Sequence, residues 1–230
     1  MLDVSKFDNP LILEAGIDEA GRGPLFGRVY TACVILPHPT NAPPELDFSL
    51  IKDSKKFTSK KRIKKVYDMI RAHAIVYSVA YHDENHIDKH NILQSTIMCM
   101  HDAVKEVHSK LGKYPNHLLV DGTYFHPIVY FDKDSECLEQ VPHTCVKSGD
   151  STYASIAAAS ILAKVERDEY IESLCDIYPA LDERYGLRKN KGYGTKQHRD
   201  GIAEHGITKW HRKSYAICKD APCQEVPRHV

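Results

Sequence analysis

The chain has 230 residues, of which 42% are hydrophobic and 27% are charged, a composition too apolar for a disordered protein and sufficient for one domain, or two, with a sizeable core. No segment approaches about 18 uninterrupted apolar residues, and residues 1–8 lack the basic and apolar regions of a secretory signal, so we expect a cytoplasmic protein without membrane association. Seven cysteines without a Cys-x-x-Cys pair argue against a disulfide framework and against a cysteine zinc site.

The formal net charge is zero, but the charges are unevenly distributed along the chain. Residues 52–65 contain eight lysines and arginines and a single acidic residue, Asp53. A second basic segment lies in residues 184–213. The two segments are either solvated helix faces or surfaces that hold a polyanion between them.

The first half of the chain predicts three strands and one helix. Residues 12–18 and 28–36 are rich in apolar and β-branched side chains and are separated by a glycine-rich turn, so we expect two paired strands. Residues 37–44 hold four prolines and predict a surface loop. Residues 59–72 have a helical pattern with a basic face, and residues 74–81 predict a third strand.

In the second half, apolar residues at three- and four-residue steps predict a long amphipathic helix over residues 91–111 that packs on the sheet. Residues 117–122 predict a buried strand that ends in a carboxylate, and residues 143–146 form another short apolar stretch. A tightly packed helix follows over residues 153–174. This order predicts a mixed α/β sheet, and the tail after residue 216 is expected to be loosely ordered.

Four carboxylates fall at the ends of predicted strands or in the turns that follow: Asp18, Glu19, Asp121 and Asp150. Ligands of α/β sheets gather at the carboxyl ends of strands, so these side chains could converge, although Asp-Gly and Gly-Asp are also common turn dipeptides. Oxygen donors without histidine or cysteine favour Mg²⁺ or Mn²⁺ over zinc. Two such ions about 3.5–4 Å apart would support nuclease chemistry.

The adjacent pair Asp18 and Glu19 sets a geometric requirement. Neighbouring strand residues point to opposite faces, so a regular strand cannot turn both carboxylates toward one metal ion. We therefore expect the strand to bend or end at this pair.

The glycine-rich turn that follows, Gly21-Arg22-Gly23 with a later Gly27, has a competing interpretation as a dinucleotide-binding loop. That loop requires a helix after the glycines. Pro24 and a β-branched run follow here, which predicts a strand instead. The turn is better interpreted as exposed backbone amides and a guanidinium beside the carboxylate pair, an arrangement suited to holding a metal ion beside a phosphate.

Several motifs in order along the chain together resemble ribonuclease HII, the type 2 ribonuclease H of bacteria and archaea. They are GIDEAGRGP at residues 16–24, DSKK at 53–56, NIL at 91–93, VDG at 120–122, GDS at 149–151, AASILAKVERD at 158–168, KGYGT at 191–195 and HRKSY at 211–215. The resemblance covers nearly the whole chain. It implies a ribonuclease H-like mixed β-sheet flanked by helices, with a catalytic domain over residues 1–180 and a C-terminal helical substrate-binding extension and tail over residues 181–230.

The resemblance also implies an activity. Members of the family hydrolyse the RNA strand of RNA–DNA hybrids and cut on the 5′ side of ribonucleotides embedded in duplex DNA, leaving 3′-hydroxyl and 5′-phosphate ends. Asp18, Glu19, Asp121 and Asp150 match the catalytic carboxylates that bind two Mg²⁺ or Mn²⁺ ions. We expect a monomer that binds these nucleic acids. The alternative is a non-catalytic hybrid-binding protein on the same fold, against which the presence of all four carboxylates argues.

The same resemblance assigns substrate contacts. Gly21, Arg22 and Gly23 match the turn that reads the ribose 2′-hydroxyl through its backbone, and the lack of side chains on the two glycines leaves room for that approach. Tyr193 matches the tyrosine that packs against the sugar beside the ribonucleotide. Lys55 could bind a backbone phosphate or face solvent.

Some residues depart from the family pattern. Ser148 stands directly before the Gly-Asp pair where many members have lysine, and Lys147 lies one position earlier. Arg28 occupies a position where proline or a small residue is common, and we interpret it as an exposed strand residue. The type 3 enzyme has Gly-Lys-Gly in the turn and an additional N-terminal domain, so the resemblance favours type 2. We interpret Ser160 as a packing or hydrogen-bonding residue and His211 as structural.

Overall fold

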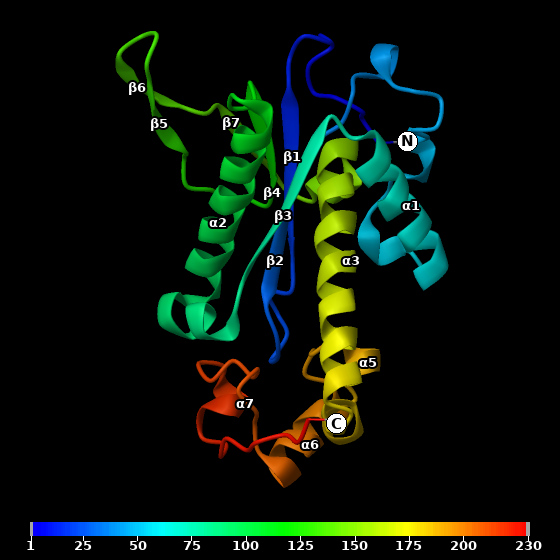
Figure 1. Ribbon diagram of the computed structural model, residues 1–230, viewed down its shortest axis with the longest axis vertical. Coiled ribbons are helices and arrows are strands. Elements are labelled where there is room, and N and C mark those ends of the chain that lie inside the picture. The colour runs from blue at the N-terminus through cyan, green and yellow to red at the C-terminus, as the bar shows by residue number, and fades with distance from the viewer. Residues whose placement is uncertain (1, 229–230) are drawn as a thin grey trace. The chain divides into compact units, whose positions relative to one another are not determined.

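The computed structural model describes residues 2–228, which form a mixed α/β fold with a five-stranded sheet (Figure 1). The strands are β1 (Glu14–Ala20), β2 (Val29–Ile35), β3 (Val76–His82), β4 (His117–Asp121) and β7 (His143–Val146). Their order across the sheet is β3-β2-β1-β4-β7, and β4 pairs in parallel with both β1 and β7. The apolar, β-branched runs predicted these strands, and the expected α/β class with a mixed sheet is confirmed.

Residue contacts divide the described chain into two compact units. Unit 1 consists of the residues up to Ala20, Thr31–Ala80 and Ile97–Val165. Unit 2 consists of Gly21–Tyr30, Tyr81–Thr96 and the residues from Glu166 onward. Because the chain passes between the units several times, β2, β3, α2 (Glu84–Leu111) and α3 (Ala154–Ile177) contribute residues to both. The division expected at residue 180 stays a prediction.

One face of the sheet in unit 1 packs against the C-terminal part of α2. Side chains alternate along a strand, so Ala15 and Ile17 of β1 point to the same face, and both are fully buried. They share a hydrophobic core with residues of β2, β4 and α2, which include Cys33, Ile35, Met100, Ala103, Val104, Val107, Leu118 and Val120. The α2 residues recur at three- and four-residue steps, so the periodicity in the sequence identified the helix face that meets the sheet.

The other face of β1 lies against the N-terminal part of α3, and Figure 1 shows α2 and α3 on opposite sides of the strands. Gly16 permits this close approach, because a Cβ at this position would lie 2.1 Å from the carbonyl carbon of Ser155. The helix contributes small side chains to the contact, since Ala154 and Ala157 are fully buried. Helix and strand therefore meet almost backbone to backbone immediately before Asp18.

The helices match the sequence pattern, but one begins earlier than expected. α1 (Lys60–His73) lies where a basic helix is predicted. α2 starts at Glu84 and leaves helical geometry at Asn91, where φ is +63° and ψ is 164°. The Asn91 side-chain oxygen accepts the N–H of Gln94 at 3.0 Å, so it caps the second part of the helix. The sequence pattern located that second start and missed the preceding turns.

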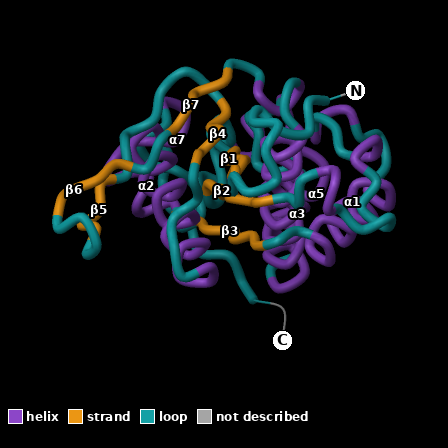
Figure 2. The backbone as a smooth tube through the Cα atoms, turned by 90° about the horizontal axis from the view of Figure 1, so that it is seen from above, coloured by secondary structure: helices purple, strands orange, loops and turns teal. Residues whose placement is uncertain are grey.

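An antiparallel hairpin of β5 (Val129–Asp132) and β6 (Cys137–Gln140) was missed by the sequence analysis. It is not part of the five-stranded sheet and projects away from it in Figure 2. Both strands are short and leave Val129, Phe131 and Leu138 exposed. They therefore lack the continuous apolar run that marks a buried strand.

Unit 2 has its own hydrophobic core among short C-terminal helices. These helices are α4 (Ala180–Tyr185), α5 (Leu187–Asn190), α6 (Lys196–His205) and α7 (Ala216–Lys219). Buried members of the core include Phe26, Ile171, Leu181, Tyr185, Leu187 and Ile202. Phe26 lies within the glycine-rich segment that follows β1, so this core packs that segment against the C-terminal helices.

The tail after residue 216 is better ordered than expected. The N–H of Ile207 donates to the carbonyl of Pro222 at 2.8 Å, and the N–H of Gln224 donates to the carbonyl of Ile207 at 2.7 Å. The expectation of a loose tail was wrong for residues 222–224, because backbone bonds that the polar composition does not reveal hold them, and residues 229–230 lie outside the described chain.

The remaining helical segments are single 3₁₀ turns. They lie at Pro39–Asn41, Phe48–Leu50, Ser54–Lys56 and Gly149–Ser151. Among the helices in residues 2–228, none has both the length and the apolar character needed to cross a membrane.

Candidate functional site

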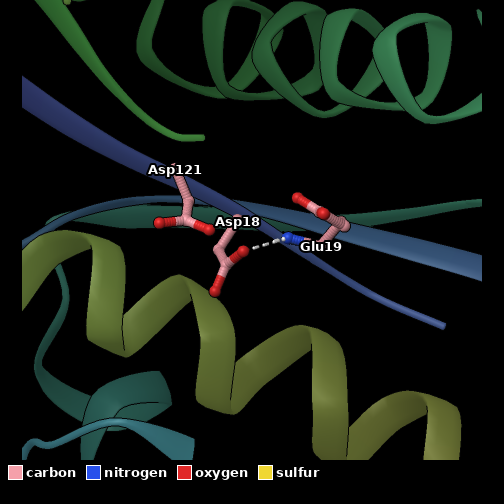
Figure 3. Close-up of side chains that lie close together, drawn as sticks. All are labelled: Asp18, Glu19 and Asp121. Atoms are coloured by element: carbon pink, nitrogen blue, oxygen red, sulfur yellow. Dashed lines mark hydrogen bonds between the residues drawn. The ribbon is translucent and has the colours of Figure 1, made fainter. Parts of the chain in front are cut away.

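Carboxylates from two neighbouring strands of unit 1 meet at one edge of the sheet. Asp18 and Glu19 belong to β1, and Asp121 is the last residue of β4. One oxygen from each of the three side chains lies within 4.8 Å of the other two (Figure 3). β1 and β4 run in parallel, with Ile17 opposite Val120, so their carboxyl ends lie at the same edge. The sheet topology therefore brings together carboxylates that are far apart in the sequence.

β1 continues to Ala20, past the carboxylate pair at which the sequence analysis expected it to bend or end. Its pairing with β4 stops at Ile17, one residue before Asp18, so β1 separates from this partner where the carboxylates begin. The Asp18 Oδ1 accepts the N–H of Glu19 at 2.6 Å (Figure 3). Neighbouring strand side chains point to opposite faces, yet the Glu19 carboxylate still joins the cluster. Its side chain is one methylene longer than that of aspartate, which extends its reach.

Burial and mutual repulsion make this cluster electrostatically unfavourable in isolation. Burial first, and then the charges of Glu19 and Asp121, raise the pKa of the Asp18 carboxyl well above its ordinary value. Burial also raises the pKa of Asp121, against the effect of the Gly149 N–H, which donates to its Oδ1 at 2.7 Å. Clustered carboxylate oxygens of this kind suit a hard divalent cation, which would neutralise the repulsion. The donor set therefore fits the metal that the sequence predicts.

Asp150 lies beside this cluster but outside the group of three oxygens within 4.8 Å. It is connected to the group in two ways. Its charge contributes to the raised pKa of Asp121, and its neighbour Gly149 donates the hydrogen bond to that residue. Its Oδ2 lies 3.5 Å from the Nζ of Lys55. Attraction to Asp150, Asp53 and Asp18 raises the pKa of the Lys55 ammonium, although partial burial acts in the opposite direction.

A buried pair of serines is hydrogen-bonded to Asp18 through Ser160. The hydroxyls of Ser54 and Ser160 lie 3.0 Å apart, and a hydrogen bond from Ser160 partly offsets the raised pKa of Asp18. Ser160 therefore has the hydrogen-bonding role that its position on the small-residue helix suggested. Ser54 was not singled out, although it stands inside the DSKK motif.

In unit 2, the glycine-rich turn lies beside Tyr193. Gly21 has a φ of +95°, and a Cβ there would lie 2.2 Å from the Nε of Arg167, so both conformation and space require glycine. A Cβ at Gly23 would lie 3.5 Å from the Cε1 of Tyr193. The Tyr193 side chain is about half exposed. The turn and the ring predicted to contact the sugar are therefore neighbours within this unit.

Arg212, which the sequence analysis did not single out, holds the turn from inside unit 2. Its buried guanidinium donates to the carbonyls of Gly21 at 2.6 Å, Arg22 at 2.9 Å, Gly27 at 2.9 Å and Arg28 at 3.2 Å. These bonds direct successive carbonyl groups of the turn into the protein. The HRKSY motif was the signal that could have identified this residue.

A second buried arginine, Arg167, completes this support. It donates to the carbonyls of Arg28 at 3.2 Å, Phe26 at 3.2 Å and Lys191 at 2.9 Å. Burial, together with repulsion from Arg212, lowers the pKa of Arg167 to about 10, so the group remains charged at neutral pH. Two guanidinium charges therefore lie behind the turn, which favours an anion on its outer side.

Arg28 is not the exposed strand residue that the sequence suggested. Its guanidinium carbon lies 3.9 Å from the ring centre of Tyr81 and 4.3 Å from that of Tyr170. The side chain is half-buried. The expectation was wrong because stacking on aromatic rings buries an arginine without requiring an acidic partner.

Two buried histidines connect Tyr193 to the core of unit 2. The backbone N–H of Thr208 donates to the Nδ1 of His211 at 2.9 Å, so a neutral His211 carries its proton on Nε2. That Nε2 lies 3.1 Å from the Nε2 of His198, whose Nδ1 in turn lies 3.0 Å from the carbonyl of Tyr193. One proton arrangement satisfies all three bonds: His211 donates to His198, and His198 donates to Tyr193.

This arrangement predicts sensitivity to acid. Burial lowers the pKa of both histidines, that of His211 to about 3 with help from His198. Below about pH 6.5 the unfolded chain binds protons that the folded pair does not, so stability is lost as pH falls. The contribution of His211 is lost down to about pH 3, at up to about 1.4 kcal/mol per pH unit. In urea unfolding from pH 7.5 to 4.5, His211→Asn should flatten this dependence and the exposed His126→Asn should not. An unchanged slope in His211→Asn would show that the pair is not held neutral.

Comparisons with known proteins agree with the motifs. The family model described as Ribonuclease HII matches residues 15–218. A protein named Ribonuclease HII from Bacteroides thetaiotaomicron is 42% identical over 212 residues, covering 92% of this chain and 94% of that protein. Another, from Parabacteroides distasonis, is 44% identical over 207 residues, covering 89% and 90%. The solved structure of ribonuclease H2 from Pyrococcus horikoshii OT3 has a TM-score of 0.69 at 21% identity, covering 90% of this chain and 96% of that one, which shows a common fold.

Proposed function

The chain belongs to the ribonuclease HII family, and on this basis we propose that Asp18, Glu19, Asp121 and Asp150 are the metal-binding catalytic residues of its active site. It is a ribonuclease H that depends on divalent metal ions and acts on the RNA strand of RNA–DNA hybrids. The proposal extends to cutting on the 5′ side of single ribonucleotides in duplex DNA, to Mg²⁺ or Mn²⁺ as the ions, and to a monomeric enzyme.

The observation that carries this proposal is the meeting of Asp18, Glu19 and Asp121 at one sheet edge. Repulsion among buried carboxylates destabilises a fold unless a cation offsets it. These carboxylates would hold two divalent ions, whose charge would activate a water for in-line attack on phosphorus and stabilise the departing 3′-oxygen. Asp150, held next to Asp121 by the Gly149 turn, is the fourth carboxylate of the proposed site.

The residues that follow the carboxylates are proposed to select the ribonucleotide. A single residue separates Glu19 from Gly21, so the turn follows directly in the chain. Arg212 and Arg167 bind the carbonyls of this segment from inside, which leaves its outer side to polar hydrogens and to the exposed Tyr193 ring. A 2′-hydroxyl distinguishes RNA from DNA at such a surface. Contacts to sugar and phosphate make cleavage insensitive to base sequence.

Lys55 is proposed to contact a phosphate near the cleaved bond. Its side chain is 80% exposed while its ammonium lies 3.5 Å from Asp150. An exposed ammonium of this kind can leave the carboxylate for a phosphate without losing a buried interaction. The alternative of a hybrid-binding protein without activity is not favoured, because binding alone gives no reason to bury carboxylates against one another.

The experiment that tests the proposal uses duplex DNA with one ribonucleotide, in Mg²⁺, in Mn²⁺ and in chelator. We expect the wild type to cut on the 5′ side of the ribonucleotide in one or both metals and not in chelator. Asp121→Asn should lose this activity, whereas Asp102→Asn, a change at an exposed α2 carboxylate that pairs with Lys105, should retain it. An intact strand in both metals would contradict the activity, and cutting by Asp121→Asn at the wild-type rate would contradict the site.

A further inference from the structure

We propose that a basic groove in unit 1 binds phosphates of the duplex beyond the cleaved bond; this inference rests on the proposed function. The groove has a volume of about 350 Å³, and its lining includes Lys52, Lys56, Arg62 and Lys65. Nothing in the proposed catalytic chemistry uses these four cations. The ligand class is the sugar–phosphate backbone of double-stranded nucleic acid flanking the ribonucleotide.

The charge of the groove is concentrated and uncompensated. No acidic residue lines it, and within residues 2–228 none of the four cations lies within 4 Å of a carboxylate oxygen. Other lysines of unit 1 behave differently: Lys64 pairs with Asp68 on α1, and Lys110 pairs with Glu106 on α2. In a chain with equal numbers of basic and acidic residues, such a group repels itself unless a polyanion occupies it.

The four cations come from two elements that form the walls of the groove. Lys56 is the last residue of the 3₁₀ turn Ser54–Lys56, and Lys52 lies two residues before that turn, with its ammonium 4.8 Å from the ring centre of Phe57. Arg62 and Lys65 are three residues apart on α1, so they project from the same side of that helix. A nucleic-acid strand repeats its negative charges at short, regular intervals, which fits cations arranged along a groove better than a single small anion does.

The position of the groove identifies the polyanion. The 3₁₀ turn that carries Lys56 also carries Lys55, whose ammonium lies 3.5 Å from Asp150, and Ser54, which bonds to Ser160 beneath Asp18. One short turn therefore connects the proposed catalytic carboxylates to the groove. A strand cut at the carboxylates has its neighbouring phosphates near this turn.

The composition of the lining favours a duplex over a single strand. Proteins that bind single strands stack successive bases on several aromatic rings. Phe57 is the one aromatic side chain among the described residues of the lining, and Lys52 lies over its ring. Cations without a stacking platform recognise the backbone and not the bases.

The test compares Lys56→Gln/Arg62→Gln with the wild type on substrates that share one ribonucleotide but have long or short flanks. The double variant should raise KM about 5- to 10-fold on the long duplex and leave kcat unchanged, with little effect on the short one. Two lost phosphate contacts should also lower the slope of log KM against log salt concentration by about 2. The matched control, Lys64→Gln on the same helix, should change neither value because Lys64 does not line the groove.

A binding measurement separates this inference from the proposed function. Fluorescence anisotropy of an all-DNA duplex in chelator requires no cleavage, and the double variant should show the same reduced salt slope there. An unchanged slope would overturn the groove proposal even in an active enzyme, as would a fall in kcat with KM unchanged on both substrates. Failure of the wild type to cut, with the slope reduced in the variant, would contradict the proposed function and leave the groove supported.

Discussion

Asp18→Asn is expected to lower kcat by about 10³-fold, equivalent to about 4 kcal/mol of transition-state stabilisation, and at the same time to raise the melting temperature of the metal-free protein. The loss follows from the position of Asp18 at the centre of the proposed metal site, within 4.8 Å of Glu19 and Asp121 oxygens. Asparagine keeps the shape and one oxygen but removes the charge that holds a divalent ion.

The gain in stability has the same origin. Asp18 is 4% exposed, and both its burial and the charges beside it disfavour its ionised form. Asparagine can still accept the N–H of Glu19 through its oxygen, so the local backbone bond survives. Removing one charge from a crowded active site commonly stabilises a protein by about 0.5–2 kcal/mol, which corresponds to a few degrees in melting temperature.

Addition of Mg²⁺ should reverse the order of the two proteins. A ligand that binds only the folded state raises its stability with concentration, so the wild type should gain melting temperature in a Mg²⁺ titration and Asp18→Asn should gain little. Asp102→Asn, which changes an exposed carboxylate of the same unit, should follow the wild type throughout. If metal-free Asp18→Asn melts below the wild type, the crowded carboxylates do not destabilise the metal-free protein.

The carboxylates and the strands that carry them could be predicted from the sequence because both are local patterns. Asp18 and Asp121 each follow a run of apolar residues, and the carboxyl ends of parallel strands share one edge of a sheet. β1 and β4 are such a pair. Composition and spacing therefore sufficed to predict that Asp18 and Asp121 lie at one edge of the sheet, although not that β1 continues to Ala20 or that Asp150 lies outside the closest group of oxygens.

The support of the glycine-rich turn was not predictable in the same way. Arg212 binds backbone carbonyls some 190 positions earlier in the chain. Every residue has a backbone carbonyl, so the residue types do not reveal which carbonyls accept these bonds. Arginine side chains are mostly exposed in folded proteins, whereas the hydrogen bonds of Arg212 permit its complete burial. Asn91 is a similar case, since the sequence predicted a helix from residue 91 but not the helical turns before it.

Arg212→Lys is expected to remove the preference for ribonucleotides while leaving general duplex binding intact. Lysine keeps the positive charge but offers one compact ammonium in place of a planar fork of donors. It cannot reach the carbonyls of Gly21, Arg22 and Gly27 together, which the guanidinium now binds at 2.6–2.9 Å. The turn should lose its fixed shape, and with it the backbone surface proposed to read the 2′-hydroxyl.

The measurement is a competition between a duplex with one ribonucleotide and an all-DNA duplex of the same sequence. The wild type should prefer the first, and Arg212→Lys should bind both with the affinity that the wild type shows for all-DNA. Its kcat/KM on the ribonucleotide substrate should fall about 10²-fold, or about 2.7 kcal/mol. Arg199→Lys, at an exposed arginine of unit 2, should keep the wild-type preference.

Arg212→Met separates this positioning role from a general effect on folding. Methionine removes the charge and the side-chain donor to the carbonyls of Gly21 and Gly27, so the free energy of unfolding should fall by about 3–5 kcal/mol. Arg212→Lys should lose much less stability, because its ammonium can still satisfy some of these carbonyls. If Arg212→Lys weakens binding of both duplexes equally while preserving the preference, Arg212 only stabilises unit 2. If the folded Arg212→Lys protein loses the preference for the ribonucleotide, the buried guanidinium of Arg212 maintains the shape of the turn that distinguishes RNA from DNA.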